Sequence, residues 1–128
     1  MSEGLAIIGC GSRDWTDQIA VDEIMLQLPV GSTIIHGDCY GADLAIDAAA
    51  RRGDFDIVSM PAKWDRHGLA AGPIRNSAML AVLLDLRRLG YETRIIAFHD
   101  DPRLGTGTRD MVQKSHLKRI PIVIVSHS

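Results

Sequence analysis

Short apolar runs alternate with longer amphipathic stretches along this chain, and this alternation limits the folds open to it. Strands separated by helices of ten or more residues are typical of βαβ units, which build a parallel sheet. The expected strands span Leu5–Ile8, Thr33–His36, Phe55–Met60, Arg94–Phe98 and Ile120–Val125. The expected helices span Thr16–Leu28, Ala42–Arg52, Pro73–Leu89 and Thr108–Lys118.

The pattern predicts one α/β domain over residues 1–128, with a Rossmann-like architecture. We expect a three-layer α/β/α sandwich around a mostly parallel five-stranded sheet. Right-handed crossovers place the first strand at the centre, and ligands bind such sheets at the carboxyl ends of the strands. The loops that follow the strands are therefore the candidate functional segments.

Local signals support the expected helices. Thr16 or Asp17 can cap the first helix, for which Ile19, Ile24 and Leu28 would form an apolar stripe. Gly72-Pro73 places proline at a helix start, and Gly90 provides a C-terminal stop. The helix between them is so apolar that we expect it to be largely buried, and we expect it to support a homodimer.

Composition narrows the function classes. The net charge of −2 and the pI of about 6.2 argue against a general nucleic-acid coat, which shows a basic footprint. The apolar runs are shorter than a membrane span and no basic segment precedes the first of them, so we expect a cytoplasmic protein without membrane attachment. Cys10 and Cys39 are expected as free thiols, and neither a metal site nor a bound cofactor is expected.

The first strand ends in Gly9-Cys10-Gly11-Ser12-Arg13, which we interpret as a tight turn that leads into a helix. Glycines let the backbone approach a phosphate, and the N–H groups and dipole of a helix N-terminus favour an anion. Ser12 and Arg13 add a hydroxyl and a guanidinium. The segment predicts a phosphate site.

The next two loops carry further candidates. After the second strand, Gly37 and Gly41 would turn backbone N–H groups toward a ligand, while Asp43 either binds that ligand or completes the helix start. In the third loop Trp64, like Trp15 earlier in the chain, would either stack a base or cap the core. Arg75, with Asn76 beside it, lies in a helix first turn where a positive charge opposes the dipole. Such a conflict favours a bound anion, the alternative being an ion pair with Asp43 or Asp14.

The loop after the fourth strand contains Gly105-Thr106-Gly107-Thr108, which opens a helix and predicts a second turn that binds phosphate. Asp110 follows and could pair with Asp43 in chemistry at a glycosidic bond. His67 and His99 are acid or base candidates, although polar loops also hold solvated histidines.

Four motifs in order resemble those of the YspA/YpsA-related (YAcAr) branch of the SLOG superfamily, which includes the Lonely Guy phosphoribohydrolases and DprA/Smf. They are G-S-R-x-W from Gly11, H-G-x-x-x-G-A-D from His36, P-A-x-W with A-G-P-x-R-N from Pro61, and G-T-x-D-M from Gly107. The resemblance implies a Rossmann-like domain that binds a nucleotide, with cleavage of an N-glycosidic bond as a further activity. Lonely Guy enzymes carry P-G-G-x-G-T-x-x-E with a catalytic glutamate. Here Met111 stands at that glutamate, Arg75 stands in for the family's arginine, and Asp110 lies one residue early, about 100° around a helix.

These readings lead to a nucleotide-binding domain that senses or sequesters an ADP-ribose-like, NAD-like or nucleoside monophosphate ligand. The alternative is a hydrolase of the N-glycosidic bond, with Asp43, Arg75 and Asp110 as catalytic candidates. Single-stranded DNA binding, as in DprA, is disfavoured by the acidic charge. The expected ligand-binding residues are Gly9, Gly11, Ser12, Arg13, Trp15, His36, Gly37, Gly41, Asp43, Pro61, Trp64, Gly72, Arg75, Asn76, Gly105, Thr106, Gly107 and Thr108.

Overall fold

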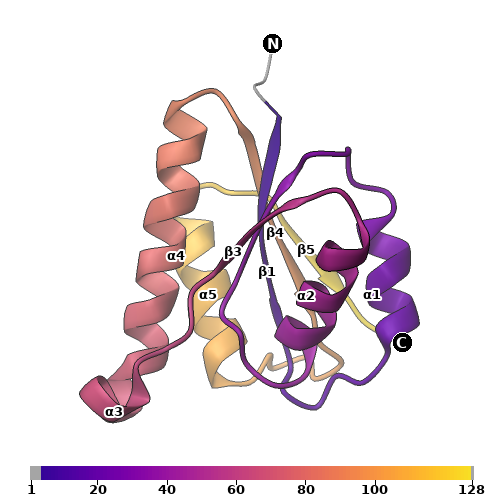
Figure 1. Ribbon diagram of the computed structural model, residues 1–128. Helices are drawn as coiled ribbons and strands as arrows, with labels where there is room; N and C mark the ends of the chain where they lie inside the picture. The colour runs from indigo at the N-terminus through magenta and orange to yellow at the C-terminus, as the bar shows by residue number, and fades with distance from the viewer. Residues whose placement is uncertain (1–3, 128) are drawn as a thin grey trace.

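The computed structural model describes residues 4–127 and contains a five-stranded, all-parallel sheet (Figure 1). The strands lie in the order β3-β2-β1-β4-β5, so the expected architecture and the central position of the first strand are confirmed. Their bounds are β1 (Leu5–Gly11), β2 (Thr33–His36), β3 (Asp56–Ser59), β4 (Glu92–Phe98) and β5 (Ile122–Val125).

Helices cover both faces of the sheet. They are α1 (Gln18–Met25), α2 (Ala42–Arg52), α3 (Trp64–His67), the 3-10 turn η1 (Gly68–Ala70), α4 (Ala71–Arg88) and α5 (Thr106–Leu117). Helices α1 and α2 lie on one face, and α4 and α5 lie on the other (Figure 1). Along β1, Leu5 and Ile7 pack toward the first pair, whereas Ala6 and Ile8 pack toward the second. Burial on both faces explains why the strand reads as a continuous apolar run.

Helix α1 is shorter than expected and presents a different face. Asp17 caps it, because its carboxylate accepts the N–H of Ala20 at 3.0 Å. The buried positions are Val21 and Met25, one turn apart, while Ile19 is 71% exposed. Of the expected stripe, Ile24 and Leu28 do pack on the core, while the expectation for Ile19 is wrong.

Helix α4 begins at Ala71, two residues before Pro73. Proline is accommodated there because the N–H groups of a first turn have no partner within the helix. The preceding segment, which we expected to be a loop, forms α3 and η1. Gly90 ends the helix as expected: its φ is +101°, and Tyr91 N donates to Leu86 O at 3.1 Å.

Only one face of α4 is buried, through Met79, Leu80 and Leu83 together with residues at its start, so the expectation of a largely buried helix is wrong. Within residues 4–127, Trp64–Arg88 is the one helical stretch long and apolar enough to cross a membrane by length and composition. Core helices of globular domains share these properties, and α4 packs on the sheet and on α5.

Candidate functional site

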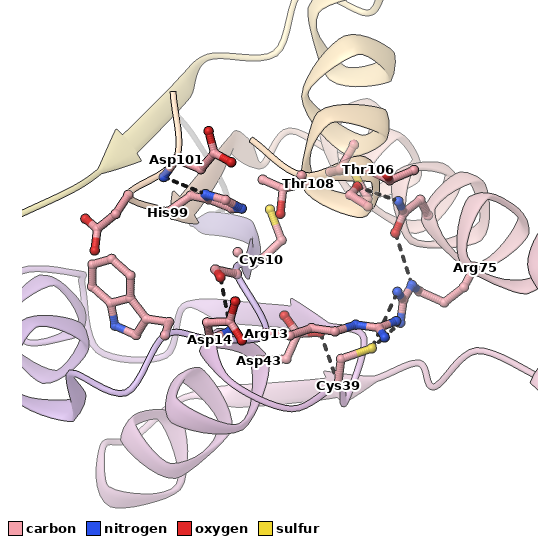
Figure 2. A pocket seen from close by; sticks show the side chains of 18 of the residues that line it. Cys10, Arg13, Asp14, Cys39, Asp43, Arg75, His99, Asp101, Thr106 and Thr108 are labelled. Atoms are coloured by element: carbon pink, nitrogen blue, oxygen red, sulfur yellow. Dashed lines mark hydrogen bonds between the residues drawn. The ribbon is translucent and has the colours of Figure 1, made fainter. Parts of the chain in front are cut away.

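A cavity of about 620 Å³ opens at the carboxyl end of the sheet, a size typical of small-molecule sites (Figure 2). Its walls come from the end of β1, the loops that follow β1, β2 and β4, and the N-terminal halves of α2, α4 and α5. The expected site residues that line it are Gly11, Ser12, Arg13, Trp15, Asp43, Arg75, Asn76, Gly105, Thr106, Gly107 and Thr108. Those that do not are Gly9, His36, Gly37, Gly41, Pro61, Trp64, Gly72 and Asp110.

The first glycine segment is part of a strand, not a turn at a helix N-terminus. Gly9 and Gly11 pair with Ile96 and Phe98 of β4, and α1 begins only at Gln18. The carboxylate of Asp17 already occupies the N-terminus of α1. The expectation of an anion site formed jointly by this segment and α1 is therefore wrong.

The glycines of β1 instead allow close packing. A Cβ on Gly9 would lie 2.8 Å from the side chain of Ile46, and one on Gly11 would lie 2.2 Å from Phe98 O. Gly41, with φ of +79°, would place a Cβ 2.4 Å from the carbonyl oxygens of Ser12 and Arg13. These contacts bring α2 against the end of β1 and shape the cavity floor.

Helix α5 presents its N-terminus to the cavity. Its first residue follows Gly105, which has a φ of +40° and provides no side-chain cap. Thr106, Gly107 and Thr108 line the cavity at this point. Because the first N–H groups of a helix have no internal partners, this wall favours an anion.

Arg75 lies beside that wall. Its Nη1 donates to Gly37 O at 2.8 Å, its Nε donates to Asn76 Oδ1 at 3.0 Å, and the guanidinium contacts Cys39 Sγ at 3.6 and 3.7 Å. In the described part of the chain, no carboxylate lies within 4.0 Å of it. The expected alternative, an ion pair with Asp43 or Asp14, does not form.

Asp110 does not line the cavity. Its Oδ2 accepts from Lys114 Nζ at 2.9 Å and from Asn76 Nδ2 at 3.0 Å, while Asn76 also donates to Gly107 O. These bonds tie α4 to α5. The carboxylate is thus bound within a structural network rather than turned toward a ligand.

Asp43 is the buried carboxylate of the cavity. Burial raises its pKa, against the opposing effects of the Cys39 N–H, which donates to Oδ2 at 3.2 Å, and of the Arg75 charge. Cys10 lies in the same cavity, and burial, followed by the Asp43 charge, raises the pKa of its thiol. Cys10 is therefore a packing residue rather than an activated nucleophile.

His36 is fully buried behind the site. Its Nδ1 accepts the N–H of Asp38 at 3.0 Å, and its Nε2 lies 2.8 Å from Asp47 Oδ1. Asp38 has a φ of +57°, a conformation that nonglycine residues rarely adopt. His36 therefore supports the loop whose Gly37 carbonyl accepts from Arg75.

The two tryptophans occupy different environments. Trp15 is 5% exposed and lies under the imidazole of His127. Trp64 is 45% exposed, with the Arg13 guanidinium 5.6 Å from its ring centroid. Of the two tryptophans, Trp64 is therefore the one with an exposed aromatic surface.

The structure adds cavity residues that the sequence did not single out as binding residues. Asp14 follows the predicted binding residue Arg13, and Asp100 and Asp101 lie in the loop after the fourth strand. Their positions in loops at the carboxyl end of the sheet could have identified them. The sequence assigns Cys10, Cys39 and His99 only thiol or acid–base roles. The added lining residues are Cys10, Asp14, Cys39, Met79, His99, Asp100, Asp101 and Met111.

Among residues 4–127, no group of three or more His, Cys, Asp or Glu side chains is arranged to hold a metal ion. The family model of the YspA, cpYpsA-related SLOG family (YAcAr) matches residues 6–67. The chain is also 31% identical over 124 residues to the Gene 61 protein of Mycobacterium phage D29, an alignment that covers 88% of this chain and 90% of the relative.

Proposed function

Because this chain belongs to the YspA, cpYpsA-related SLOG family, we propose that it binds a nucleotide or nucleotide-derived ligand in the cavity at the carboxyl end of its sheet. The family indicates nucleotide-related binding or processing. The ligand is a nucleoside monophosphate or an ADP-ribose-like or NAD-like molecule. The domain senses or sequesters it in a reducing compartment such as the cytoplasm, which suits its two free thiols.

The main support for a phosphate-containing ligand is the guanidinium of Arg75, which lines the cavity. The sequence placed this charge in the first turn of a helix, but α4 begins at Ala71, so Arg75 lies in the second turn. No carboxylate lies within ion-pair distance of its guanidinium in the described chain. The uncapped start of α5 lies in the wall of the same cavity. Guanidinium and backbone N–H groups together match the oxygens of a phosphate.

The base is placed at the cavity edge. Trp64 is exposed there, and Arg13, which lines the cavity, lies over its ring. An aromatic surface of this kind stacks any base, so it supports affinity without selecting among bases.

The first experiment is native mass spectrometry of the gently purified protein, followed by denaturation to identify any released molecule. Calorimetry with AMP, ADP, ADP-ribose and NAD then compares the parent with Arg75→Ala. Arg88→Ala is the matched control, because Arg88 lies on α4 but pairs with Asp85 at 2.5 Å. We expect a loss of roughly tenfold or more in affinity for Arg75→Ala alone. If none of the four molecules binds the parent, the proposal fails.

A second function is favoured by Asp43. Burial raises the pKa of Asp43, which suits its carboxyl to donate a proton to the leaving base in N-glycosidic hydrolysis. Free base released from nucleotides by the parent, and lost in Asp43→Asn, would establish this activity. The absence of release at high protein concentration would exclude it for the tested nucleotides.

We also propose that two copies associate through the α4–α5 face. Leu117 is 80% exposed and Ile74 is 47% exposed there, and an apolar groove of about 280 Å³ runs between the two helices. The residues that line this groove are Ser77, Leu80, Ala81, Leu84, Lys114, Leu117 and Lys118. Apolar surface of this extent favours association in water.

A further inference from the structure

Strands β2 and β4 flank β1 in the sheet, and each leads into a histidine. His36 ends β2, His99 follows β4, and both make the same local hydrogen bond. His36 Nδ1 accepts the N–H of Asp38 at 3.0 Å, and His99 Nδ1 accepts the N–H of Asp101 at 3.1 Å. A ring nitrogen that accepts from a backbone N–H carries no proton, so the proton of the neutral imidazole lies on Nε2. In both residues Nε2 is therefore a hydrogen-bond donor.

The two donors have different surroundings. His36 Nε2 is 2.8 Å from Asp47 Oδ1, within the protein. His99 is 8% exposed, lines the cavity, and has no partner for Nε2 in the described structure. Figure 2 shows this nitrogen directed into the cavity, and a Cβ on Gly105 would lie 3.3 Å from it. The residue is buried, but its unpaired Nε2 is open to the cavity, where it can donate to a bound acceptor.

His99 and Arg75 lie on opposite sides of the cavity, with Thr106 and Thr108 of α5 between them in the view of Figure 2. The donors thus flank the N-terminus of α5, which itself favours an anion. A phosphate beside Arg75 and a second phosphoryl group beside His99 would give each of these donors an acceptor.

On this geometry, and resting on the proposed nucleotide function, we propose that His99 binds the ligand through Nε2 and contacts a second phosphoryl group. The preferred ligand class is therefore one that contains a diphosphate, rather than a nucleoside monophosphate. His99 acts here as a binding residue that selects the ligand, and no chemical step is assigned to it.

The test compares ADP with AMP by calorimetry in the parent and in His99→Asn. The asparagine Oδ1 replaces Nδ1 as the acceptor for the Asp101 N–H, while the Nε2 donor is lost. His99→Gln returns an N–H donor near the Nε2 position, and His116→Asn on the exposed face of α5 is the matched control. Thermal unfolding of each variant shows whether it folds as the parent does.

We expect the parent and His116→Asn to bind ADP about tenfold more tightly than AMP, and His99→Asn to bind the two equally. His99→Gln should recover part of the preference. A parent without preference, or a preference that persists in His99→Asn, overturns this inference while leaving nucleotide binding in place. If neither ADP nor AMP binds the parent, the proposed function fails with it.

The ring itself gives an independent readout. Nitrogen NMR of the labelled parent should show the proton of His99 on Nε2, and ADP should shift that nitrogen more than AMP does. A proton on Nδ1 overturns the inference whatever the calorimetry shows.

Discussion

The imidazole of His127 stacks on the indole of Trp15, with ring centroids 4.5 Å apart and planes inclined by 17°. His127 Nδ1 lies 2.7 Å from Asp100 Oδ2, and its Nε2 lies 2.8 Å from Asp17 Oδ2. Two carboxylate partners require a proton on each ring nitrogen, so this arrangement is that of the imidazolium. It covers a face of Trp15, the residue expected from sequence as an alternative surface for a base.

This relationship predicts a dependence on pH. The carboxylate of Asp100, followed by that of Asp17, raises the pKa of His127, so its stabilising contribution is complete below the ordinary histidine value and is lost as pH rises through the raised value. The pKa values of Asp17 and Asp100 are lowered, chiefly by the Ala20 N–H and by His127 respectively. Their contributions are present above the ordinary aspartate value and are lost as pH falls through the lowered values.

We therefore expect the contact to be strongest in mildly acidic solution. Fluorescence of Trp15, followed in a Trp64→Phe background from about pH 4 to about pH 9, should change as His127 loses its proton. His127→Gln should remove that transition. An identical transition in His127→Gln would assign it to another group.

Gly41→Ala should destabilise the protein by roughly 3 kcal/mol or more, because the new Cβ would overlap the carbonyl oxygens of Ser12 and Arg13. Gly31 is the matched control. Its φ of +84° is similar to the +79° of Gly41, but nothing lies within 4 Å of an added Cβ. Gly31→Ala should cost only about 1 kcal/mol, from the backbone conformation. Urea unfolding measures both changes, and equal costs would show that the close approach is unimportant.

Asp110→Asn should lower the free energy of unfolding by about 0.5 kcal/mol, because it removes the partly exposed ion pair with Lys114. The asparagine oxygen still accepts from Asn76, so nucleotide affinity should stay within about twofold of the parent. Any release of free base should likewise persist. Denaturant unfolding and calorimetry test the first two points. A loss of base release would instead give Asp110 a catalytic role.

Leu117→Glu should convert a dimer to a monomer, because it places a charge on the exposed α4–α5 face. Light scattering coupled to size-exclusion chromatography measures the mass. Leu26→Glu is the control, since Leu26 is 83% exposed at the end of α1, on the other side of the sheet. A monomeric parent would overturn the proposed association.

The regular elements of this fold were predictable where local and tertiary preferences agree. Strand β2 and helix α2 begin and end where the sequence places them, and a glycine stands at each end of α2, Gly41 and Gly53. Helix α1 was predicted too long, because its apolar residues do not share one face. The start of α4 was predicted too late, because proline is tolerated throughout a first turn.

Sequence patterns alone predict the parallel sheet and the loops at its carboxyl end, because periodicity and turn residues are local properties. It also placed Arg75 and Gly105–Thr108 among the candidates, and these line one cavity. Which side chains line that cavity depends on how the helices and loops pack in the folded chain. Asp110 turns to Lys114, His36 turns to Asp47 and Trp15 is covered by His127, whereas His99 faces the cavity. The contacts of Trp15 with His127 and of Asp110 with Asn76 join residues far apart in the chain, and no local pattern encodes their proximity.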